Sequence, residues 1–134
     1  LDEASGNLAI VSIGLLSSLP QISDAIIDAR TQPGFAGSPI VEIRQASPTT
    51  TTGLGLASST VRGLILNGFH NGIAIALNSG VCIVEENYIG TDSSGTLPAN
   101  NFTGIRAGSP VGGQIRNNVI SGNINANSTI TLPR

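Results

Sequence analysis

The chain has 134 residues, enough for one domain, and carries a net charge of −2 with 10% charged and 3% aromatic residues. All six basic residues are arginines scattered along the chain, so no basic cluster is available for phosphates, and we expect no nucleic-acid partner. The longest apolar run, residues 8–16, is much shorter than the roughly 20 residues that cross a bilayer, so we expect no membrane span.

The first predicted element is an apolar strand within residues 1–17. Its aliphatic side chains fall on both faces of the strand: Leu8, Ile10, Val11 and Ile13. A strand without a polar face needs a cover on each side. We therefore predict that residues 1–17 form a cap, or an inter-subunit strand that self-associates through these four side chains.

The segment that follows alternates short aliphatic stretches with turn sequences. We expect a strand at residues 25–28, although the isoleucine spacing there also fits a short helix beginning at Ser23. Turn residues at 31–34 precede a further strand at residues 40–43. The polar run at residues 47–53 predicts an exposed loop.

One pattern then occurs three times: an aliphatic residue, a charged residue, two variable positions, a bulky residue, an aliphatic residue and a turn. We expect each copy, at residues 61–68, 84–91 and 115–122, to be one strand and a turn, followed by a weaker strand. The copies begin 23 residues apart (Val61 to Val84) and then 31 (Val84 to Ile115), and a turn-rich insertion at residues 91–98 accounts for the difference. Two short strands per repeat predict an all-β solenoid with coils roughly 4.8 Å apart.

Stacking of the repeats predicts columns of like side chains. Three of them are aliphatic: Val61, Val84 and Ile115; Leu66, Ile89 and Ile120; and Ile73, Ile105 and Ile130. A fourth places Asn87 over Asn118, where the side-chain amides can bond one another or the turn backbone.

The motifs NYIGTD at residues 87–92 and NNVISGN at 117–123 resemble those of the bacterial right-handed parallel β-helix repeat proteins of the pectate-lyase-like superfamily. Further similar segments lie between residues 18 and 73. The resemblance implies a single domain over residues 1–134, with a right-handed parallel β-helix of about four to five coils in residues 18–134. It also implies a secreted protein, extracellular or at the cell surface. Ala29 departs from the glycine that the family usually has at that turn.

The superfamily contains polysaccharide lyases and hydrolases, so the resemblance makes a carbohydrate site a candidate feature of this chain. Glu85 aligns with Arg62 and Arg116 of the neighbouring repeats, and Tyr88 is close in sequence. These four residues form either a solvated ion ladder beside a packing tyrosine, or a ligand-binding site for an anionic sugar. A glycosidase needs two carboxylates roughly 5 to 10 Å apart on one groove, and adjacent Glu85 and Glu86 leave a strand on opposite faces. We expect no catalytic residues.

The remaining candidate residues indicate neither a metal nor a cofactor. His70 lies in a turn without a second ligand at metal spacing, and Asp92 offers one carboxylate, too few for calcium. Cys82 lies in an apolar strand, as expected of a small buried side chain. Asn101 and Asn127 match the N-glycosylation acceptor, which points to the surface.

Two functions remain open from the sequence. The first is a non-catalytic extracellular structural protein whose β-helix subunits self-associate end to end into a filament or surface layer. The alternative is a polysaccharide-binding or polysaccharide-degrading, lyase-like module. The scarcity of aromatic residues argues against the alternative, because sugar-binding platforms usually need exposed rings.

Overall fold

The computed structural model describes residues 9–76, 79–108 and 112–124. There the chain forms one turn of 3-10 helix, η1 (Ala29–Thr31), and thirteen strands: β1 (Val11–Leu15), β2 (Ile22–Ser23), β3 (Ile26–Asp28), β4 (Val41–Gln45), β5 (Thr52–Ala57), β6 (Thr60–Arg62), β7 (Leu64–Asn67), β8 (Asn71–Ile75), β9 (Cys82–Glu85), β10 (Tyr88–Ile89), β11 (Thr103–Ala107), β12 (Gly113–Arg116) and β13 (Val119–Ile120). No helix in these residues is long and apolar enough to span a membrane. The expected all-β class is confirmed, and the segment that also fitted a helix contains strand β3.

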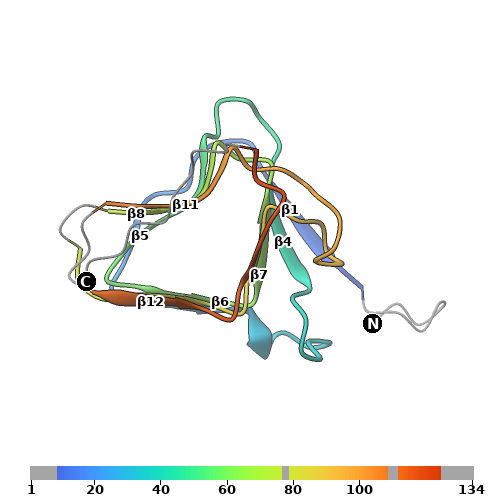
Figure 1. Ribbon diagram of the computed structural model, residues 1–134, viewed down its shortest axis with the longest axis horizontal. Coiled ribbons are helices and arrows are strands. Elements are labelled where there is room, and N and C mark those ends of the chain that lie inside the picture. The colour runs from blue at the N-terminus through green and yellow to red at the C-terminus, as the bar shows by residue number, and fades with distance from the viewer. Residues whose placement is uncertain (1–8, 77–78, 109–111, 125–134) are drawn as a thin grey trace.

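Within the described residues the strands form three sheets, ordered β1-β4-β7-β10-β13, β11-β8-β5-β2 and β12-β9-β6-β3. Each pairing is parallel and joins a strand to the one three places later, so successive strands belong to successive sheets. In Figure 1 the sheets form three sides of a roughly triangular coil. Parallel sheets stacked in this way make a solenoid, consistent with a β-helix.

Each copy of the repeat motif turns a corner, so the prediction of one strand per copy is wrong. The copies contain the strand pairs β6 and β7, β9 and β10, and β12 and β13. Between the two strands stands one residue with left-handed backbone: Gly63 (φ 75°), Glu86 (φ 58°) or Asn117 (φ 56°). One such residue redirects the chain onto the next sheet while the aliphatic pattern continues across it. A repeat therefore holds three strands, not the two predicted.

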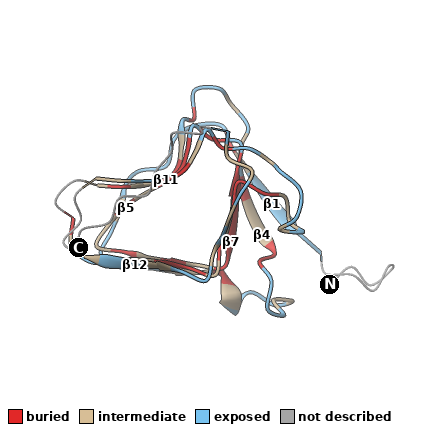
Figure 2. Cartoon of the chain, in the orientation of Figure 1, coloured by how far each residue is buried: buried red, intermediate tan, exposed pale blue. Residues whose placement is uncertain are grey.

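The inward side chains stack in register across the coils. The pairing confirms two predicted columns in full: Val61, Val84 and Ile115, and Leu66, Ile89 and Ile120. Ile73 pairs with Ile105 as predicted, whereas Ile130 lies outside the described residues. Burial is greatest in the middle of the stack, and Figure 2 shows β7 buried while β1 and β12 near its two ends are largely exposed.

Strand β1 lies at one edge of the five-stranded sheet, where in the described residues it pairs with β4 alone. The strand was expected at residues 8–13, but it begins at Val11 and continues through Gly14 to Leu15. Gly14 permits close packing here, because a Cβ at this position would stand 2.9 Å from the Cβ of Ala46. Leu8 is outside the described residues.

Candidate functional site

Four charged residues occupy equivalent positions on the sheet β3-β6-β9-β12: Asp28, Arg62, Glu85 and Arg116. Both guanidinium Nε atoms, of Arg62 and of Arg116, donate to the carboxylate of Glu85, one to each oxygen. The Glu85 side chain is only 7% exposed because the two arginines cover it. The predicted alignment of Glu85 between two arginines is therefore confirmed.

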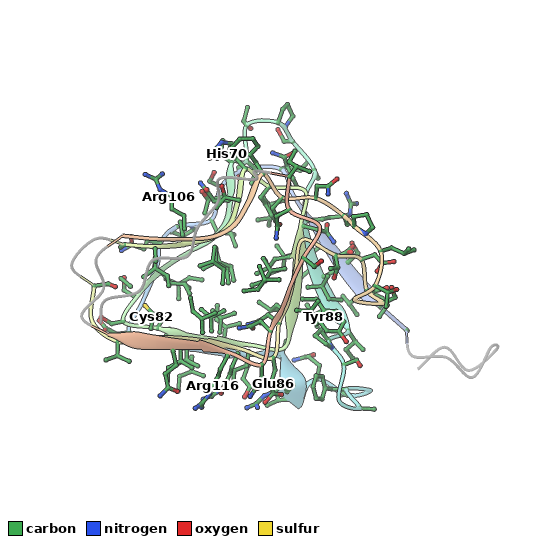
Figure 3. All side chains as sticks on the ribbon, in the orientation of Figure 1. His70, Cys82, Glu86, Tyr88, Arg106 and Arg116 are labelled. Atoms are coloured by element: carbon green, nitrogen blue, oxygen red, sulfur yellow. The ribbon has the colours of Figure 1, made fainter. Side chains whose placement is uncertain are left out.

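Arg30 and Glu86 extend this column into a network of three acids and three arginines. Arg30 Nη2 lies 2.7 Å from Asp28 Oδ2, and its Nη1 lies 3.0 Å from Glu86 Oε1. Figure 3 shows Glu86 and Arg116 on the outer side of this corner of the coil. We call the six residues Asp28, Arg30, Arg62, Glu85, Glu86 and Arg116 the ion ladder. Sequence reasoning missed Arg30, which lies 56 residues from Glu86 and outside the aligned repeats.

Two carboxylates of the ion ladder, those of Glu85 and Asp28, have lowered pKa values. The pKa of Glu85 is lowered, first by the hydrogen bond from Arg116 and then by the one from Arg62. A hydrogen bond from Arg30 lowers the pKa of Asp28, and the same contact raises the pKa of Arg30. A general acid or base works best with a pKa near the operating pH. The shifts instead favour the ionised states of Glu85, Asp28 and Arg30, which suits a structural role.

Tyr88 lies on a different sheet from the ion ladder. It stands on β10, aligned with Ile65 and Val119 as predicted. Its ring packs against the inserted loop, since a Cβ on Gly95 would stand 2.9 Å from ring atom Cε2. Thr91 and Pro98 close that loop with an antiparallel bridge. Of the four residues predicted to form a ligand site, the structure brings Arg62, Glu85 and Arg116 together. Tyr88 packs on another sheet.

Asn101 is a structural corner residue, contrary to the prediction of a surface glycosylation site. Its side chain is fully buried, its Oδ1 accepts from the Phe69 N–H at 3.0 Å, and its Nδ2 donates to the Leu66 carbonyl at 3.0 Å. A glycan on this nitrogen has no room in the folded chain. The second predicted acceptor, Asn127, lies outside the described residues.

Asn87 and Asn118 form the predicted amide ladder at another corner. Asn87 Nδ2 lies 3.1 Å from Asn118 Oδ1, and Asn87 Oδ1 accepts from the Leu64 N–H at 2.9 Å. Each asparagine also donates to a backbone carbonyl of the preceding coil, that of Val61 or Val84. These side chains bind adjacent coils together where the sheets stop.

The other candidate residues stay apart from one another. His70 stacks on Phe102 with ring centroids 4.8 Å apart, and Cys82 is buried in the core as predicted. Asp92 accepts hydrogen bonds from Ser94 within its own loop, which lowers the pKa of Asp92. In the described residues no three His, Cys, Asp or Glu side chains are grouped to hold a metal.

The hydrophobic core opens at the end of the stack that begins with β1. A cavity of about 480 Å³ lies there, lined mainly by aliphatic side chains that include Val11, Ile13, Ile27, Ile40, Val41 and Leu64. Val11 and Ile13 lie in register with the inward-facing Leu64 and Leu66, two strands away. They are nevertheless 54% and 46% exposed. Of the four side chains predicted to self-associate, Val11 and Ile13 thus face an open core end.

A shallow depression of about 370 Å³ lies on the outer face of the sheet β11-β8-β5-β2. Gly55, Ala74 and Arg106 follow one another in register there, and Gln21 and Thr52 also line it. Figure 3 shows Arg106 projecting from this side of the coil. Sequence reasoning missed the depression because a glycine and an alanine carry no chemical signal by themselves.

Comparison with known proteins assigns no function to the chain. The chain matches no family model, no curated protein and no solved structure. The likeness to pectate-lyase-like proteins therefore stays a prediction from the motifs.

Proposed function

We propose that the chain is a right-handed parallel β-helix that acts outside the cell as a non-catalytic structural protein, self-associating end to end into a filament or surface layer. The strand order supports four complete three-strand coils, β1 to β12, with β13 beginning a fifth. The right-handed sense is supported by the strong preference of parallel crossover connections for that hand. The extracellular location follows from the family resemblance alone.

The observation that supports self-association most directly is the open apolar end at β1. Val11 and Ile13 line the cavity at this end and are 54% and 46% exposed. Strand β1 carries no Lys, Pro or charged side chain, the usual devices that keep sheet edges from pairing. An end that binds the opposite end of another copy makes a contact that does not close, and such contacts produce fibres.

The state of the carboxylates supports a non-catalytic role. Arginines hold Asp28, Glu85 and Glu86 in the ion ladder, and Asp92 is bound within its own loop. On the sheet β1-β4-β7-β10-β13, Glu42 accepts hydrogen bonds from Ser12 and Asn67. The described residues thus present no pair of carboxylates free to flank a sugar bond.

Ile13→Lys tests the proposal directly. A lysine here places a charge on the exposed edge and in the mouth of the apolar cavity, so we expect light scattering and negative-stain images to change from assemblies to single particles. Val81→Lys is the matched control, because Val81 is 56% exposed but precedes β9 in the middle of the stack. If the unmodified chain is monomeric at micromolar concentration, self-association is rejected.

The depression beside Arg106 favours a second candidate function, binding of a polysaccharide. Its floor of small residues lets a flat ligand approach the sheet, and the Arg106 guanidinium suits an anionic sugar. Affinity electrophoresis with acidic and neutral polysaccharides tests this. We expect any retardation by an acidic polymer to be lost in Arg106→Gln and kept in Arg44→Gln, which alters an exposed arginine on another sheet. Equal retardation of both variants would reject this site.

A further inference from the structure

The sheet β1-β4-β7-β10-β13 has one strand more than the other two sheets in the described residues. Within those residues its outermost strands, β1 and β13, therefore extend furthest along the stack axis. Both strands already pair on one side as parallel strands, β1 with β4 and β13 with β10. Among the described residues the other edge of each strand carries unpaired N–H and C=O groups, which can pair in parallel with a copy stacked in the same direction.

The inner face of this sheet is aliphatic from one end to the other. A single column runs through all five strands: Ile13, Ile43, Leu66, Ile89 and Ile120. Ile13 is 46% exposed at one end, and Ile120 is partly buried against the core at the other. A second copy stacked head to tail would place Ile120 beside Ile13, so the column would continue without a polar residue and cover apolar surface at the joint.

We propose that self-association of this protein is polar and specific: strand β13 of one copy pairs in parallel with strand β1 of the next, with Ile120 beside Ile13. This proposal rests on the self-association proposed above and names the two surfaces that meet. The partner is a second copy of the chain, and the joint continues the solenoid.

Cysteine cross-linking tests the pairing. Ser12 and Val119 occupy the same outward row of the five-stranded sheet, so they would be neighbours across the joint. Two single variants, Ser12→Cys and Val119→Cys, are prepared separately, mixed before assembly, allowed to assemble together and treated with a short bis-maleimide. We expect a cross-linked dimer from the mixture and none from either variant alone. The unmodified chain is the control for Cys82, which is buried.

The possible results separate the two proposals. Cross-linking of Ser12→Cys to itself would mean head-to-head pairing and would overturn the polar joint. Assembly by light scattering without a mixed dimer would also overturn it, while leaving self-association intact. No assembly under any salt condition would overturn both proposals. Assembly with the mixed dimer would support the joint.

Discussion

At the scale of single residues, the buried polar side chains of this protein join one coil to the next. Asn87 has no exposed surface, and its amide bonds backbone or side-chain atoms of the coils on both sides. Glu85 joins adjacent coils through ion pairs, with Arg62 of one neighbouring coil and Arg116 of the other. Because water is shut out around Asn87, removing its amide leaves backbone groups unsatisfied, and each of those costs about 1–3 kcal/mol. Such residues select the stacking register.

Glu85→Gln gives a prediction of pH dependence. Arg116 and Arg62 lower the pKa of Glu85 below its ordinary value of 4.5, so the folded state favours the charged carboxylate. The resulting stability is present above pH 4.5 and is lost as pH falls through the lowered pKa. We expect the unmodified chain to melt at a higher temperature than Glu85→Gln at pH 7, and the difference to shrink below pH 4.5. Thermal melts from pH 7 to pH 3 measure this. A constant difference over that range would contradict it.

At the scale of elements, the strands of the sheet β11-β8-β5-β2 depend on a column of glycines at one corner. Gly53, Gly72 and Gly104 follow paired residues at the starts of β5, β8 and β11. A Cβ on Gly72 would stand 2.7 Å from the Gly104 carbonyl oxygen and 2.9 Å from Asn101 Nδ2. The corner asparagine and the next coil occupy this space, so a side chain has no room.

Gly72→Ala is therefore expected to lower the free energy of unfolding by about 1–3 kcal/mol, the usual cost of overpacking. Gly55→Ala on the neighbouring strand is the matched control, because a Cβ there would stand 3.9 Å from the Cα of Gln21, an ordinary van der Waals contact. Urea unfolding of the two variants makes the comparison. Equal losses of stability in the two variants would mean that replacing a glycine anywhere in these strands is destabilising, and that the crowded corner has no special effect.

At the scale of the whole molecule, stability comes from stacking, because no coil can bury its own apolar face. Several strands have only two or three residues, far too few to persist alone. The middle coils are covered on both sides, which explains why Val61, Leu66 and Val84 are completely buried. The first coil lacks such cover in the described residues, so its aliphatic side chains line an open cavity. End-to-end association would complete the same packing between molecules.

The sequence by itself determined which residues stand above one another. Repeats of a parallel stack place equivalent positions in neighbouring coils side by side, so aligning the copies was enough to predict the aliphatic columns, the Asn87 and Asn118 ladder, and Glu85 between its arginines. The register of the stack is a one-dimensional property, and periodicity reveals it.

Only the tertiary structure decided how each coil turns and what its corners bring together. Single left-handed residues and the loops between strands decide four features. They create the third strand of each repeat, bring Arg30 into the ion ladder, separate Tyr88 from it and bury Asn101. One residue such as Glu86 can change the chain direction without interrupting the aliphatic pattern. Contacts across corners leave no periodic trace, and this is the physical reason that the alignment could not show them.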